Sequence, residues 1–148
     1  MTDAKTASII AELHYADPNA ALNWLSKTFG FQTEMIVKDG SGKIIFSEMK
    51  IDGASVAIVP EVLGVMRSPK TAKGLSTQTV QIRFSRDIDA HYKHAKANGA
   101  RILSEPETHF FGDRTYIASD LEGHTWNFGQ RLNEAGPPPQ GWSIEFPS

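Results

Sequence analysis

The sequence predicts an α+β fold made of two tandem βαβββ modules, each consisting of a strand, a helix and three further strands. Three observations support this fold. A strand-like run precedes an amphipathic helical pattern, the same order returns about 70 residues later, and each copy ends in two strands joined by a glycine-containing turn. The chain has 148 residues, which suits one domain. We divide it into module one at about 8–60, a linker at 61–79, module two at about 80–131 and a proline-rich tail at 134–148.

Module one begins with the partly alternating run 8–15 (SIIAELHY), which predicts a strand. Asp17 and Pro18 then supply an N-cap and a first-turn proline, and Gly30 stands where a glycine commonly ends a helix. Between them, apolar side chains recur every three or four residues, as in an amphipathic helix. Three more strands are expected near 33–38, at 43–50 and at 54–60.

Module two repeats this order. The run 80–85 (VQIRFS) predicts a strand, Asp87 or Asp89 offers an N-cap, and the helical stretch stops at Gly99. Three more strands are expected near 101–103, at 113–119 and at 124–130. The last two strands of each module flank a turn, and the turn glycines, Gly53 and Gly123, are 70 residues apart.

The composition limits the classes of molecule that the protein is expected to bind. The net charge is −2 and the pI is about 6.2, so no basic surface is available for nucleic acid or for an anionic membrane. No apolar run approaches the roughly 20 residues of a membrane span, and the first residues show no export signal, so we expect a cytoplasmic protein. The chain has no cysteine, which excludes disulfides, thiol catalysis and thiolate metal ligands.

Two segments resemble the vicinal oxygen chelate superfamily, which includes glyoxalases, bleomycin-resistance proteins and extradiol dioxygenases. They are the run 15–32 (YADPNAALNWLSKTFGFQ) and the run 112–128 (GDRTYIASDLEGHTWNF), in which Leu121 replaces the usual proline. The resemblance implies a curved mixed sheet that forms a cupped cavity, with helices on its outer face. It also implies a homodimer, because family members commonly pair or swap their halves.

Enzymes of this superfamily bind a divalent metal, whereas its drug-binding members hold a ligand without one. The resemblance maps the metal-ligand positions onto Ile10, Ala57, Val80 and Asn127. Only Asn127 carries an oxygen, and a catalytic divalent site usually needs about three good ligands. A one-residue shift of the first strands would present Ala11 and Gln81 instead, of which only Gln81 is a potential ligand. We therefore expect no metal and no other cofactor, as in a branch of the superfamily that lacks the metal site.

Strand alternation then predicts the side chains that line the cavity. If residues 120–123 form a tight turn, Tyr116 lies opposite Asn127, while Trp126 and Phe128 face the helices. The expected ligand-binding residues are Glu12, His14, Phe46, Glu48, Ile82, Phe84, Arg114, Tyr116 and Asn127.

Several of these side chains allow two interpretations. Glu48 is the candidate catalytic base, or it is a structural carboxylate paired with Arg114. Arg114 binds a substrate carboxylate or phosphate, or it forms a structural ion pair. Glu12 and His14 form an acid–base pair, or they lie exposed at a strand edge.

The leading hypothesis for function is a metal-independent protein that binds a small organic molecule in the cupped cavity for sequestration or resistance. One alternative is a metal-dependent lyase, isomerase or dioxygenase of the glyoxalase type. Another is an interaction module that acts through the tail, whose aromatic residues we expect to dock on the domain or on a partner subunit. Whether the protein is an enzyme stays open at this point.

Overall fold

The computed structural model describes residues 6–147, and these form two compact units. The first unit contains residues 6–76 together with 121–124, and the second contains residues 77–120 and 125–147. Each unit has one open, curved four-stranded sheet and one α-helix, in the order strand, helix and three strands. The prediction of two βαβββ modules in an α+β fold is confirmed.

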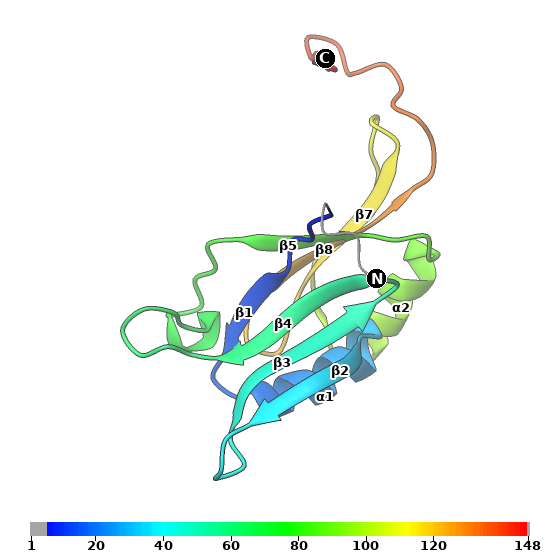
Figure 1. Cartoon of the computed structure of the whole chain (residues 1–148). Coiled ribbons are helices and arrows are strands. Elements are labelled where there is room, and N and C mark those ends of the chain that lie inside the picture. Colours follow the sequence, from blue (N-terminus) through cyan, green and yellow to red (C-terminus); the bar gives the residue numbers. More distant parts are fainter. Residues whose placement is uncertain (1–5, 148) are drawn as a thin grey trace. The chain divides into compact units, whose positions relative to one another are not determined.

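The first sheet has the strand order β1-β4-β3-β2 (Figure 1). Its elements are β1 Ala11–Tyr15, α1 Pro18–Phe29, β2 Gln32–Lys38, β3 Ile44–Ile51 and β4 Ala54–Pro60. β1 runs parallel to β4, and the other neighbours are antiparallel. A short 3-10 helix, η1 Pro69–Thr71, follows in the segment predicted as a linker.

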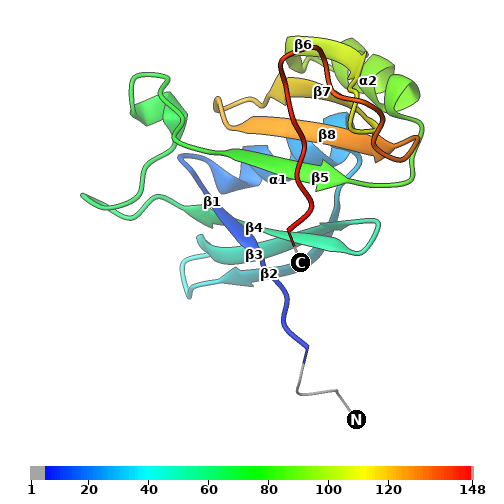
Figure 2. The same cartoon turned by 90° about the horizontal axis from the view of Figure 1, so that it is seen from above.

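The second sheet repeats this arrangement with the order β5-β8-β7-β6 (Figure 2). Its elements are β5 Thr79–Arg83, α2 Ile88–Ala97, β6 Arg101–Thr108, β7 Asp113–Ser119 and β8 Thr125–Arg131. β6 extends well beyond the predicted 101–103 and includes Pro106. A proline is tolerated there because β6 is an edge strand, and its pairing with β7 shifts between Ser104 and Glu107.

Local chemistry explains the helix boundaries. The carboxylate of Asp17 accepts a hydrogen bond from the amide of Ala20 at 3.1 Å, and Gly30 ends α1 in the left-handed conformation at φ 86°. At α2 the cap is Asp87, not Asp89, and its carboxylate accepts the amide of Ala90 at 3.1 Å. Neither helix of the described residues is long and apolar enough to cross a membrane.

Each helix covers one face of its own sheet with buried apolar side chains. In the first unit these include Leu13, Tyr15, Leu25, Phe29 and Ile58. In the second unit they include Ile88, Tyr116, Trp126 and Phe128, so the prediction that Trp126 and Phe128 face the helix is confirmed. The opposite face of each sheet carries no helix of its own unit, and we call it the open face.

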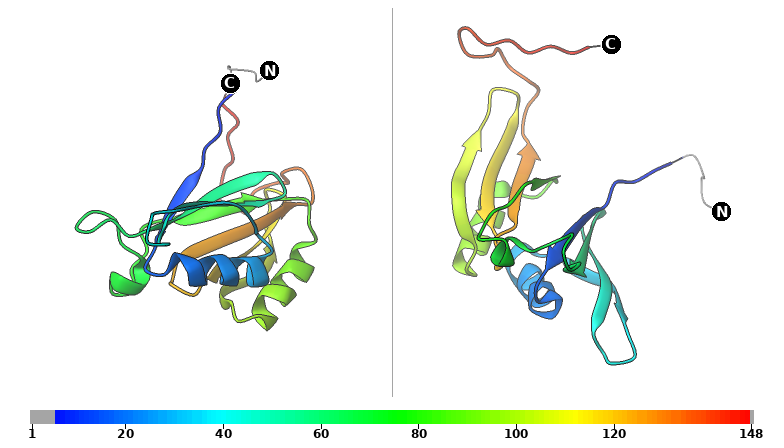
Figure 3. Two further views of the ribbon diagram at one scale, coloured as in Figure 1. Left: turned by 60° about the horizontal axis from the view of Figure 1, so that its bottom comes forward. Right: turned by 90° about the vertical axis from the view of Figure 1, so that its left-hand side faces the viewer.

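The tail begins against the turn between β6 and β7 (Figure 3). The amides of Leu132 and Asn133 donate to the carbonyl of Gly112, and the amide of Gly136 donates to that of Phe110 at 2.7 Å. A Cβ on Gly112 would lie 2.0 Å from the Asn133 oxygen, so only glycine fits there. The expected docking of the tail's aromatic residues on the domain is only partial. Trp142 contacts the Phe110 ring but keeps 67% of its surface exposed.

The turn between β7 and β8 belongs to the first unit and is held there by a buried carboxylate. Glu122 is 3% exposed and accepts hydrogen bonds from the amides of Ala16 at 2.7 Å and Asp17 at 2.9 Å and from the Ser68 hydroxyl at 2.5 Å. His124 adds a bond from Nε2 to the carbonyl of His14 at 2.8 Å. These contacts join the turn to the segment between β1 and α1 and to the start of η1.

We predict that Glu122→Ala lowers the free energy of unfolding by about 3 kcal/mol, because it leaves buried donors without an acceptor. Urea denaturation measures this change. The matched control is Glu134→Ala at an exposed tail position, which should stay within about 0.5 kcal/mol of the parent. Equal destabilisation by the two substitutions would contradict the assignment.

Candidate functional site

The open face of the first sheet carries four of the predicted ligand-binding residues. Glu12 of β1 and Glu48 of β3 both pair with Ala57, which lies between them on β4. His14 and Phe46 are each two residues away on the same strands, so strand alternation puts them on the same face. This arrangement agrees with the predicted alternation, and the binding role of these residues stays a prediction.

The two basic side chains near the carboxylates of Glu12 and Glu48 bond to other groups. His14 donates from Nδ1 to the carbonyl of Pro60 at 2.9 Å and makes no bond to Glu12 in the described residues. Lys50 shares the face with Glu48 but pairs with Glu34, with 3.5 Å between Nζ and the carboxylate. The carboxylates of Glu12 and Glu48 are thus free to contact a ligand.

In module two the predicted register between β7 and β8 is wrong by one residue. Ser119 pairs with Thr125, and Ile117, not Tyr116, lies opposite Asn127. The connection therefore spans 120–124 and is one residue longer than a tight turn. A shift of one residue exchanges the two faces of a strand, so Arg114 and Tyr116 face α2 and not the open face.

Arg114 forms the structural ion pair that was one of its two interpretations. Its Nε and Nη2 donate to the two carboxylate oxygens of Asp89 at 3.0 and 2.9 Å, and Nη1 donates to the hydroxyl of Thr108 at 3.0 Å. The hydrogen bonds from Arg114 hold the pKa of the Asp89 carboxyl below its usual range. The Arg114 guanidinium therefore lies on the helix side of the second sheet, bonded to Asp89 and Thr108, and does not pair with Glu48.

The prediction that Tyr116, Ile82 and Phe84 line the cavity is also wrong, because all three lie on the helix side of the second sheet. The Tyr116 hydroxyl is buried 2.6 Å from Nδ1 of His91 on α2, and burial raises its pKa above the usual range. Ile82 pairs with Phe128, and the Phe84 ring lies 5.0 Å from the His91 ring, so both residues belong to the core under α2. The apolar residues Ile82 and Phe84 alternate along this segment because they pack into the core beneath α2, and not because they line a cavity.

The observed strand pairings of β1 with β4 and of β5 with β8 also change the mapped metal-ligand positions. The residue of β1 that pairs with Ala57 is Glu12, not Ile10, and the residue of β5 that pairs with Asn127 is Gln81, not Val80. Only Glu12 offers a charged oxygen, while Gln81 and Asn127 offer neutral amides. These residues do not fit a divalent site that ordinarily takes three imidazole or carboxylate ligands. No cluster of three such groups occurs among residues 6–147.

Asn127 lies on the open face of the second sheet with Gln81 and Ile117. Its side-chain oxygen is buried and has no hydrogen-bond partner within the described chain. Buried polar atoms are normally hydrogen-bonded, so this oxygen is a candidate acceptor for a donor on a ligand.

Sequence reasoning missed an ion-pair network on this same face. The Asp113 carboxylate, 1% exposed, binds Nη2 of Arg83 at 2.7 Å and Nε of Arg131. Burial alone would raise the pKa of Asp113, but the hydrogen bonds from Arg131 and Arg83 outweigh it and lower the pKa. The three residues come from separate strands, so only the pairing of β5, β7 and β8 reveals the network.

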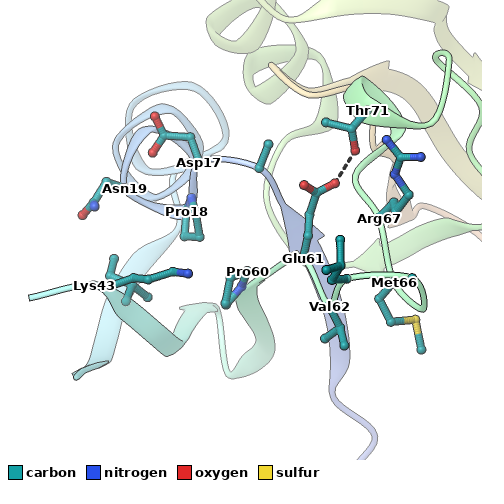
Figure 4. A pocket seen from close by; sticks show the side chains of 14 residues that line it. Asp17, Pro18, Asn19, Lys43, Pro60, Glu61, Val62, Met66, Arg67 and Thr71 are labelled. Atoms are coloured by element: carbon teal, nitrogen blue, oxygen red, sulfur yellow. Dashed lines mark hydrogen bonds between the residues drawn. The ribbon is translucent and has the colours of Figure 1, made fainter. Parts of the chain in front are cut away.

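A pocket of about 790 Å³ in the first unit was also missed, because its outer wall lies in the segment predicted as a linker. Residues 16–19 before and within α1, Lys43 and Ile44 at the start of β3, and residues between 60 and 71 form its walls (Figure 4). Glu61 fixes the outer wall by accepting hydrogen bonds from the Ser68 amide at 2.8 Å and from the Thr71 hydroxyl.

We predict a stability difference that depends on pH between the parent and Asp113→Asn. The lowered pKa of Asp113 stabilises the fold fully above its unfolded-state pKa of about 3.9, and this contribution is lost as the pH falls through the folded-state pKa. Urea denaturation should show a deficit of about 1–2 kcal/mol at pH 7 that shrinks towards pH 2. The exposed control Glu107→Gln should show no such trend, and a deficit that is constant with pH would contradict the assignment.

Comparison with known proteins agrees with the fold. The model of the Glyoxalase/Bleomycin resistance protein/Dioxygenase superfamily matches residues 10–128. TioX from Micromonospora sp. ML1 is 30% identical, with a TM-score of 0.68 over 84% of this chain and 95% of its own. TnmS3, an antibiotic binding protein from Streptomyces sp. CB03234, has a TM-score of 0.67 at 17% identity, over 88% of this chain and 99% of its own.

An uncharacterised protein of Mycobacterium tuberculosis (strain ATCC 25618 / H37Rv) is 28% identical over 121 residues, which cover 80% of this chain and 71% of the relative. The family match extends over both modules and includes both segments that carry the resemblance. The chain therefore belongs to the Glyoxalase/Bleomycin resistance protein/Dioxygenase superfamily.

Proposed function

We propose that the protein binds a small organic molecule of the antibiotic class, without a metal, and sequesters it. The observation that carries this proposal is the buried, unpartnered side-chain oxygen of Asn127 on the open face of the second sheet. An enclosed acceptor of this kind suits a ligand that brings its own donor. The superfamily includes bleomycin-resistance proteins, and TnmS3, which shares the fold, is an antibiotic binding protein.

The open face of the first sheet, taken by itself, favours a ligand of a particular charge. Its open face combines the half-buried ring of Phe46 with the carboxylates of Glu12 and Glu48, and the nearby cation Lys50 already pairs with Glu34. An aromatic surface beside unpaired carboxylates favours a flat ligand that carries a positive charge. In this proposal Glu48 acts as a counter-charge to the ligand, and its role as a catalytic base is the competing interpretation.

A panel of bleomycin and cationic aromatic antibiotics tests this proposal. We predict that at least one member raises the melting temperature, because a ligand that binds only the native state stabilises it by mass action. Phe46→Ala should abolish the shift, and Glu48→Gln should weaken binding about tenfold, a loss of roughly 1.4 kcal/mol. The matched control, Leu75→Ala at an exposed apolar position outside both sheets, should leave the shift intact. No shift with any member of the panel would contradict the proposal.

Metal independence is tested separately. We predict that the protein purified without chelators or an affinity tag contains less than about 0.1 equivalent of metal, and that Ni²⁺, Zn²⁺, Mn²⁺ and Fe²⁺ leave its melting temperature unchanged. One equivalent per chain that is lost in Glu12→Ala or Gln81→Ala would instead support the metal-dependent enzyme.

The proposal includes a homodimer. Strand β2 is an edge of the first sheet and exposes three consecutive large apolar residues, Met35, Ile36 and Val37. An unpaired apolar edge favours pairing with another copy. We expect light scattering to give twice the monomer mass, and Ile36→Lys to give the monomer. Ile9→Lys, at an exposed apolar position outside the sheet, is the control and should remain dimeric.

A further inference from the structure

We propose that the pocket in the first unit, between the start of α1 and residues 60–71, binds a small organic anion with an apolar body. This site goes beyond the proposed function, because none of the open-face residues Glu12, Phe46 and Glu48 lines the pocket. Its ligand also has the opposite charge.

The size and the walls of the pocket suit a small molecule. Its volume of about 790 Å³ lies within the range of roughly 300–1,000 Å³ that is usual for small-ligand sites. Val62 and Met66 bond to each other through both backbone amides at 2.9 Å, which closes the outer wall into a narrow turn. Ser68 anchors the end of this wall, because its amide donates to Glu61 and its hydroxyl donates to the buried Glu122. A wall held in this way binds a ligand without a large ordering cost.

The two acidic side chains of the pocket are already engaged. Asp17 accepts the amide of Ala20 as the cap of α1. Glu61 accepts the Thr71 hydroxyl and the Ser68 amide, and these hydrogen bonds keep its pKa below the usual range. Hydrogen bonds from the protein therefore already occupy oxygens of both carboxylates.

The two basic side chains are not engaged. Within residues 6–147, neither Lys43 nor Arg67 makes a side-chain hydrogen bond or an ion pair, and each only experiences the charge of a nearby carboxylate, Asp39 and Glu61 respectively. In Figure 4, Lys43 and Arg67 lie on opposite sides of the pocket, with Pro60 and Glu61 between them. An ammonium group and a guanidinium group with all their donors free favour an anionic ligand.

Apolar groups complete the lining. Val62 and Met66 expose 48% and 47% of their surfaces, and Pro18 and Pro60 present rings towards the same space (Figure 4). Exposed apolar surface of this size is covered favourably by an apolar ligand, and a methionine adapts to its shape. Together with the two cations, this lining fits an aromatic carboxylate or sulfonate.

The probe for this site is 8-anilino-1-naphthalenesulfonate, titrated by fluorescence against the full chain in 150 mM NaCl. We expect one site per chain, and a Kd that rises about tenfold in the double variant Lys43→Gln/Arg67→Gln. Met66→Ala should weaken the same binding through the apolar wall. The neutral analogue N-phenyl-1-naphthylamine should bind wild type and the double variant equally.

The matched control is Lys70→Gln/Lys73→Gln, which removes the same charge from neighbouring exposed positions outside the pocket. A weaker Kd in Lys43→Gln/Arg67→Gln together with an unchanged Kd in this control supports the site. An equal loss in both double variants, or no loss in either, would overturn it. Phe46→Ala should leave probe binding intact. Failure of this site is thereby separated from failure of the proposed open-face function, which the bleomycin panel tests on its own.

Discussion

The buried carboxylate of Glu122 organises the first unit. Its three donors come from the segment between β1 and α1 and from Ser68, so a single side chain fixes the start of α1 and the end of the pocket's outer wall. Through the Ser68 amide the same network reaches Glu61, which in turn holds Thr71. Because a buried charge is stable only when its hydrogen bonds are satisfied, these segments have little freedom to separate.

The sequence was sufficient for elements whose causes are local. The periodicity of α1, the cap at Asp17 and the turn glycines are all visible within a few residues, and strand alternation placed Glu12 and Glu48 on one face. The β7–β8 register was not predictable in this way. The turn is one residue longer than the tight form, and it contains Glu122, whose partners lie more than 50 residues away in sequence. That one residue moved Arg114 and Tyr116 to the helix side.

The pairing of the charged side chains supports the proposal that a cation binds on the open face of the first sheet. Arg114 pairs with Asp89, Arg83 and Arg131 pair with Asp113, and Lys50 pairs with Glu34. Each of these cations pairs with a carboxylate of its own unit. The carboxylates of Glu12 and Glu48 pair with no cation among the described residues. Sequence alone could not assign these pairs, because each depends on which residues of two different strands or helices lie close together in the fold.

We propose that the protein holds its ligand and returns it unchanged. Equilibrium dialysis against bleomycin and the other cationic aromatic antibiotics, followed by denaturation and mass spectrometry of the released compound, tests this claim most directly. We predict retention of about one equivalent per chain and recovery of the compound at its original mass and with its original NMR spectrum, which also excludes an isomer. Recovery of a compound with an altered mass or an altered NMR spectrum would show catalysis, and no retention of any compound would contradict the proposed binding.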